Sequence, residues 1–154
     1  MATKGFVDYT ATRTVQYFSS GTFEKGVCLV MNTGTFSGIS NEHASRYAIA
    51  AANGSGAKPI GLCENKVVNY DLTRQKLNPF DRLEVQTGQK VSIITRGWMD
   101  TNQISGTPTV GADCYLAANG QVSATQLTGY PLIGRFLTAK DGNSYAQVAV
   151  MLAN

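Results

Sequence analysis

Charged side chains are scarce in this sequence. Asp, Glu, Lys and Arg make up 15% of its 154 residues, whereas about 25% is usual for a soluble domain. The net charge is only +3, and Lys and Arg form no run, which argues against a groove that follows a nucleic-acid backbone. A surface with so little charge suits burial against another protein, and it equally suits a neutral soluble surface.

Residues that catalysis requires are equally scarce. The only histidine, His43, sits in a polar segment, and we expect it to be solvated rather than to act as a base. The nucleophile-elbow pattern Gly-x-Ser-x-Gly is absent, and residues 54–59 (GSGAKP) have neither the spacing nor the final hydroxyl residue of a phosphate loop. The acidic residues are single and dispersed, so no glycosidase pair is indicated. We therefore predict that the protein is not an enzyme and uses no cofactor.

Metal sites, disulfides and membrane spans are not indicated either. The three cysteines, Cys28, Cys63 and Cys114, lie far apart within apolar runs and have no second Cys or His at zinc-ligand spacing. The first residues open no apolar stretch, so we expect no secretory signal, and buried thiols are then the default. No window of about 20 apolar residues occurs, so we expect no membrane-spanning helix.

Short period-two runs of apolar residues are abundant. They occur at residues 68–72, 82–87, 90–95 and 147–152. Alternation of this kind buries one face of a sheet. Turn dipeptides such as Asn53-Gly54 and Asn119-Gly120 stand between the runs and supply the positive φ of tight hairpin turns. We predict an all-β fold of short antiparallel strands, with at most one short helix.

Residues 41–52 are the one place where a helix is plausible, because Ser40 or Asn41 could cap an Ala-rich stretch. Residues 46–52 favour a strand instead, because residues 58–61 (KPIG) follow at hairpin distance. No linker divides the chain after this point, so residues 26–154 are expected to form one β domain.

One pattern occurs twice. Residues 26–30 (GVCLV) are followed by a turn and later by residues 59–62 (PIGL), and residues 111–116 (GADCYL) are followed by a turn and then by residues 131–134 (PLIG). Each copy reads as glycine, strand, tight turn, strand, loop and a strand that carries Ile-Gly. The pattern predicts a β-hairpin with an added strand in each half of the chain.

The first 25 residues differ from the rest. They contain five aromatic residues, scattered among Thr and Ser with no helical period: Phe6, Tyr9, Tyr17, Phe18 and Phe23. We predict an extended N-terminal arm over residues 1–25, with these five side chains as candidate contacts to a partner. The alternative is that they pack on their own domain.

Residues 26–152 resemble the small head-decoration and cement proteins of tailed bacteriophages. Five short segments, in this order, carry the resemblance: VG (110–111), YL (115–116), NGQV (119–122), PLIG (131–134) and QVAV (147–150). Residues 58–62 (KPIGL) and 91–97 (VSIITRG) are similar to earlier strands of the same proteins.

This resemblance implies a compact β-barrel or β-tulip domain. It implies a location on the outer capsid surface of a virion after synthesis in the host cytoplasm, with the major capsid protein as partner and self-association as a homotrimer. Such a protein staples neighbouring capsid subunits, and the family supplies no catalytic motif.

Two other kinds of function fit the sequence. A virion head-fibre or carbohydrate- and receptor-binding module would use Trp98 as a stacking platform, although a buried core tryptophan is commoner. A small barrel that binds single-stranded nucleic acid would use interleaved basic and aromatic residues. The candidates for this are Tyr70, Arg74, Lys76, Phe80 and Arg82.

Overall fold

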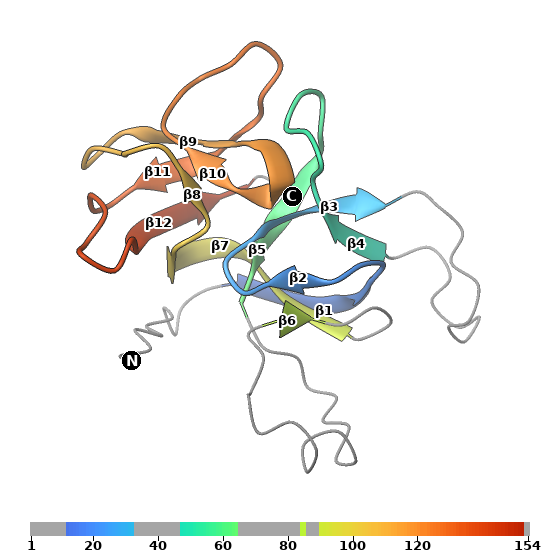
Figure 1. Cartoon of the computed structure of the whole chain (residues 1–154). Helices are drawn as coiled ribbons and strands as arrows, with labels where there is room; N and C mark the ends of the chain where they lie inside the picture. Colours follow the sequence, from blue (N-terminus) through green and yellow to red (C-terminus); the bar gives the residue numbers. More distant parts are fainter. Residues whose placement is uncertain (1–11, 33–46, 65–83, 86–89, 153–154) are drawn as a thin grey trace.

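The structure is a computed structural model that describes residues 12–32, 47–64, 84–85 and 90–152. Almost all regular structure in these ranges is β, and the helical element is a single 3-10 turn at Ala118–Gly120. The prediction of an all-β fold is thus confirmed (Figure 1). The strands are β1 (Thr12–Ser19), β2 (Phe23–Glu24), β3 (Cys28–Asn32), β4 (Tyr47–Ala50), β5 (Pro59–Cys63), β6 (Glu84–Val85), β7 (Lys90–Thr101), β8 (Ile104–Ser105), β9 (Asp113–Leu116), β10 (Val122–Ser123), β11 (Leu132–Phe136) and β12 (Ala146–Met151).

Five strands close into a barrel in the order β1-β4-β3-β5-β7, and β1 completes the ring by pairing with β7. β1 runs parallel to β4 and antiparallel to β7. The carboxylate of Glu64, directly after β5, links β1 and β7. Arg13 of β1 donates from Nε to Glu64 Oε1 at 2.7 Å, and the Ser92 hydroxyl of β7 donates to Glu64 Oε2 at 2.8 Å. A closed ring leaves no barrel strand with an unpaired edge.

The long strand β7 joins this barrel to a second sheet. Its first half pairs with β1 and β5, and its second half, from Arg96 to Thr101, pairs with β12. The sheet continues in the order β12-β11-β9-β10-β8. Figure 1 shows these later strands, coloured orange to red, gathered on one side of the barrel. We call this part the second sheet.

Two hydrophobic clusters fill the molecule. Alternate residues of β3, β5 and β7 divide between them: Leu29, Cys63 and Ile93 belong to the cluster inside the barrel. Their sequence neighbours Cys28, Leu62 and Ile94 belong to the cluster shared with the second sheet. All six are fully buried, so these strands are covered on both faces: one face lines the barrel interior and the other packs against the second sheet.

The pattern that occurs twice in the sequence corresponds to two similar strand arrangements. In the barrel the order is β4-β3-β5-β7, and in the second sheet it is β10-β9-β11-β12. The strand that carries Ile-Gly is β5 in one and β11 in the other, and each has a register shift at or beside its glycine. The hairpin predicted in the second copy is confirmed as the antiparallel pair β9–β10. In the first copy, the turn at Thr33-Gly34 and the strand expected after it lie outside the described residues, and β3 pairs antiparallel with the later strand β4.

The turn Asn119-Gly120 locks the two halves together. Asn119 and Gly120 have φ of 57° and 70°, as a tight Asn-Gly turn requires. The amides of both donate to the loop after β4, Gly120 to the carbonyl of Ala51 at 2.8 Å. A Cβ on Gly120 would lie 2.4 Å from Cγ1 of Val27. The turn therefore fits against the barrel only when it carries glycine at this position.

Two details of the prediction differ from the structure. The strand expected at residues 46–52 is present as β4, but β4 pairs with β3 and β1 and not with β5. β3 lies between them because it pairs antiparallel with both. The short loop between β4 and β5 favoured a direct hairpin between them. In the structure, the apolar strand β3 lies between β4 and β5 and pairs with both.

Part of the expected N-terminal arm belongs to the folded domain. Residues 12–24 hold β1 and β2, and β1 is a full member of the barrel. An arm over residues 1–25 is therefore wrong for residues 12–25, because the apolar side chains of this stretch have a core to enter. Residues 1–11 lie outside the described residues.

Candidate functional site

The five aromatic residues predicted as partner contacts fall into three groups. Tyr17 and Phe18 lie half-buried on β1, and the Nζ atom of Lys90 lies 5.8 Å from the centre of the Phe18 ring. Phe23 is only 5% exposed and belongs to the cluster inside the barrel. The prediction of Phe23 as a contact is wrong, because a side chain in the core cannot reach a partner. Phe6 and Tyr9 lie outside the described residues.

The three cysteines are buried free thiols, as predicted. Burial raises the pKa of the Cys28 thiol, and the neighbouring Cys114 raises it further. Burial also raises the pKa of Cys114, to about 12. Both thiols therefore stay protonated and are poor nucleophiles at neutral pH.

Acidic and metal-ligating side chains of the described residues form no clusters. Within residues 12–32, 47–64, 84–85 and 90–152, no group of three or more His, Cys, Asp or Glu could hold a metal ion. In the same ranges no helix is long and apolar enough to cross a membrane. His43, Tyr70, Arg74, Lys76, Phe80 and Arg82 lie outside the described residues.

Trp98 is half-buried and is not a member of either core cluster. The expectation of a buried core tryptophan is therefore wrong. In β7 the neighbouring Met99 points into the core and is fully buried. Because side chains alternate along a strand, Trp98 faces the opposite side of the second sheet, away from the barrel.

The register of four strands assembles a surface around Trp98. We call it the outer sheet face; it comprises Arg96, Trp98, Asp100, Asp113, Tyr115, Leu132, Arg135, Leu137, Gln147, Ala149 and Met151. One row crosses β9, β11, β12 and β7 as Asp113, Arg135, Ala149 and Trp98. On one side of this row Tyr115 pairs with Leu132 and Met151 with Arg96. On the other side Gln147 pairs with Asp100.

Apolar and charged groups mix on the outer sheet face. Leu132 and Met151 are 53% and 59% exposed. The Arg135 Nε and the Asp113 Oδ1 lie 3.7 Å apart with both side chains exposed. The Gln147 side-chain amide donates to Asp100 Oδ1 at 3.3 Å. The exposed Arg135–Asp113 pair contributes little to stability and leaves its charges available to a partner.

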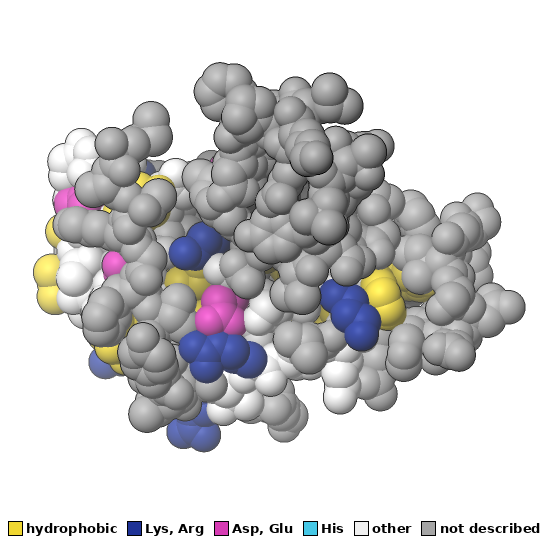
Figure 2. Space-filling model, turned by 90° about the horizontal axis from the view of Figure 1, so that it is seen from below, with side chains coloured by type: hydrophobic (Ala, Val, Ile, Leu, Met, Phe, Trp, Pro, Cys, Tyr) yellow, Lys and Arg dark blue, Asp and Glu magenta, His cyan; other side chains and the backbone are white. Residues whose placement is uncertain are grey.

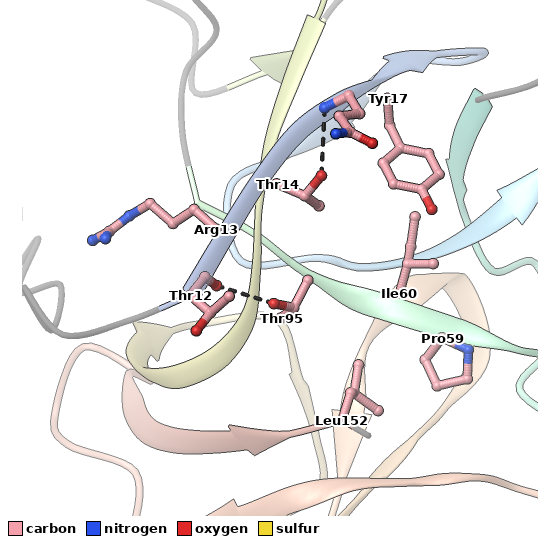
Figure 3. Close-up of a pocket in the computed structure, with 9 residues that line it drawn as sticks. Thr12, Arg13, Thr14, Tyr17, Pro59, Ile60, Thr95 and Leu152 are labelled. Carbon is pink, nitrogen blue, oxygen red and sulfur yellow. Dashed lines mark hydrogen bonds between the residues drawn. The ribbon is translucent and has the colours of Figure 1, made fainter. Parts of the chain in front are cut away.

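A second candidate site is a groove of about 330 Å³ at one end of the barrel. Figure 3 shows Tyr17, Ile60, Pro59 and Leu152 facing the groove, whereas Arg13 points away from it. Thr95 Oγ1 donates to the carbonyl of Thr12 at 3.1 Å across its floor. The groove thus offers hydroxyl and apolar groups and suits an uncharged group.

Among the described residues, basic side chains form no continuous track on the face drawn in Figure 2. Among the described side chains of that view, the Lys and Arg atoms form separate patches, and acidic atoms lie next to one of them. A single-stranded nucleic acid would need a connected basic groove with stacking aromatics.

The chain matches no model of a known protein family, and a search of curated proteins gives no significant match.

Proposed function

We propose that the protein is a structural virion protein that binds the outer surface of a phage capsid and cements neighbouring major capsid subunits. On this proposal it is made in the host cytoplasm, needs no active site and is incorporated on the outer capsid surface of the virion. Such a protein needs a scaffold of fixed shape and a contact surface that tolerates burial. The closed ring of strands and the exposed apolar groups of the outer sheet face support this proposal.

The observation that carries the proposal is how the family-like sequence folds. The succession at residues 110–150 resembles capsid decoration proteins, and it forms the continuous strands β9, β10, β11 and β12. Residues 58–62 and 91–97, similar to earlier strands of the same proteins, form β5 and part of β7. The strands formed by these segments thus belong to one sheet, and residues 110–111 and 119–120 lie in turns between its strands.

Self-association as a homotrimer is part of the proposal. Closed symmetry would match the local symmetry of a capsid surface. Three linked copies also raise the effective concentration of each contact, so that individually weak contacts hold together. The aromatic residues Phe6 and Tyr9 remain proposed contacts to the capsid or to neighbouring copies.

The test is association with particles. Purified protein is mixed with empty heads assembled from the major capsid subunit encoded in the same genome, and bound protein is measured by co-sedimentation. We expect saturable binding and heads that withstand higher temperature when decorated. Absence of binding at any concentration, with a monomer in solution, would contradict the proposal.

A carbohydrate-binding module remains a second candidate because Trp98 lies on an outward face. Gln147 and Asp100 beside it offer planar polar groups of the kind that bind sugar hydroxyls. Binding to a glycan array that Trp98→Ala abolishes would favour this candidate.

A further inference from the structure

We infer that the outer sheet face is the surface that docks on the capsid, and that its partner is a flat protein surface of mixed charge on the shell subunit. The inference rests on the proposed function and names the part of the molecule that performs it.

Exposed apolar side chains concentrate on this face. Six large hydrophobic residues are exposed among the described residues, and three of them, Leu132, Leu137 and Met151, lie on the outer sheet face. Tyr115 and Trp98 lie beside them and are half-buried. The other three exposed residues are separate: Met31 is in barrel strand β3, whereas Val110 and Leu127 are in loops. Several exposed apolar groups on one face, here interspersed with Arg135 and Asp113, are more typical of interaction sites than isolated apolar groups are.

The charges of the face select the class of partner. Arg96 and Arg135 balance Asp100 and Asp113, so the face has no net charge. A nucleic acid or an anionic lipid surface would require an excess of basic residues. Residues of both signs placed between apolar groups suit a protein surface that presents the complementary pattern.

The size of the outer sheet face indicates whether its partner is the capsid shell or a second copy of this chain. Four strands about 4.8 Å apart, with three rows of residues about 7 Å apart, cover about 400 Å². A stable pair of proteins buries about 800 Å² on each partner. The face is therefore too small to hold a dimer in solution. It is sufficient where many copies bind a repeating surface, because each contact then adds to the others.

The chain offers closely matched control residues for a test. Leu132 is 53% and Leu127 51% exposed, and Met151 is 59% and Met31 49% exposed. The face variant combines Leu132→Gln with Met151→Gln, and the control variant combines Leu127→Gln with Met31→Gln. Both variants remove the same atoms from exposed positions, so we expect both to melt within a few degrees of the natural protein. Binding to empty heads is then compared by co-sedimentation.

We expect the face variant to need about tenfold more protein for half-saturation of the heads, and the control variant to bind as the natural protein does. A third variant, Arg135→Asp with Asp113→Arg, keeps the exposed pair but reverses its polarity. It should weaken binding as well, because the partner's charges then meet like charges.

Each other outcome overturns the inference in a distinguishable way. If the natural protein binds heads and the face variant binds equally well, the cement function stands and the docking surface is elsewhere. If the natural protein never binds heads, the proposed function itself fails. If the natural protein forms dimers in solution that the face variant abolishes, the occupant is a second copy of this chain.

Discussion

Gly134 lies directly against the backbone of Ala149 on the neighbouring strand. A Cβ atom on Gly134 would stand 1.8 Å from the carbonyl oxygen of Ala149, and the equivalent Gly61 of the barrel would place its Cβ 2.2 Å from the carbonyl oxygen of Ile94. In both copies of the repeated pattern, the glycine after isoleucine thus allows the backbones of adjacent strands to approach closely.

Gly134→Ala is expected to destabilise the protein strongly. The atom that the new methyl group meets is a backbone oxygen, which cannot move aside as a flexible side chain could. We expect a loss of at least about 2 kcal/mol. In thermal unfolding followed by circular dichroism, this corresponds to a fall in Tm of about 4–8 °C or more.

The control for this substitution is Gly142→Ala. A Cβ on Gly142 would meet nothing within 4 Å, and its φ is not in the left-handed region. Its Tm should change by less than about 2 °C, because surface substitutions without new contacts stay within about 0.5 kcal/mol. Equal effects of the two substitutions would contradict the role given to Gly134.

Thr101→Val should cost about 1–3 kcal/mol of unfolding free energy. The buried Thr101 hydroxyl donates to the carbonyl of Gly26 at 3.0 Å and accepts from the amide of Gln103 at 3.0 Å. Valine keeps the shape and removes both bonds, which leaves a buried carbonyl without this donor. Thr101→Ser keeps the hydroxyl and should cost less than Thr101→Val in urea unfolding. The reverse order would show that the methyl group, and not the hydrogen bonds, is what matters.

Stability should fall at alkaline pH because of the buried thiols. The folded state raises the pKa of Cys28 and raises the pKa of Cys114 to about 12, from an ordinary value of 9.0. Above pH 9 the unfolded chain therefore loses these protons while the folded chain keeps them. Unfolding is then favoured by about 1 kcal/mol per pH unit for each thiol. Below pH 8 the thiols should make no contribution to the pH dependence of the unfolding free energy.

Urea unfolding between pH 8 and 10.5 measures this dependence, and Cys114→Ala isolates one thiol. The variant is less stable throughout because it loses packing, but its stability should decline less steeply above pH 9. Parallel curves for the two proteins would contradict the assignment. In the folded state at pH 8, both thiols should also resist alkylation until urea unfolds the chain.

The sequence predicts the strands better than it predicts their partners. Alternation at residues 147–152 correctly identifies Val148 and Val150 as buried, and the Asn119-Gly120 turn follows from local backbone preferences. Pairing is different, because β3 separates β4 from β5 and β1 closes a ring with a strand more than 70 residues away. Such pairings depend on which apolar faces meet, and no local signal encodes that.

The outer sheet face could not be predicted from the sequence for the same reason. Each of its strands shows half-buried or exposed alternate positions, such as Gln147, Ala149 and Met151. Only the register of four strands brings these positions beside Trp98 and Leu132. The sequence around Trp98, including the preceding Gly97, does not indicate which face of β7 its side chain occupies.

Deletion of residues 2–25 is expected to unfold the protein. It removes β1, which pairs with β4 on one side and β7 on the other, and it removes the buried Phe23. It also leaves Glu64 without the Arg13 Nε that lies 2.7 Å away. Loss of one strand of a closed five-stranded ring exposes the barrel core, and the cost exceeds the total stability of about 5–15 kcal/mol that a domain has.

Deletion of residues 2–11 is the control, because it removes no described strand. This shorter variant should keep a cooperative thermal transition, whereas the longer deletion should show none by circular dichroism and should bind a dye for exposed apolar surface. The two variants also separate two roles of the N-terminal region. Only the shorter one can report whether Phe6 and Tyr9 contribute to capsid binding, since loss of binding by an unfolded chain says nothing about contacts. A cooperative transition in the longer deletion, near the Tm of the full chain, would show that β1 is an appendage and that the barrel is stable without it.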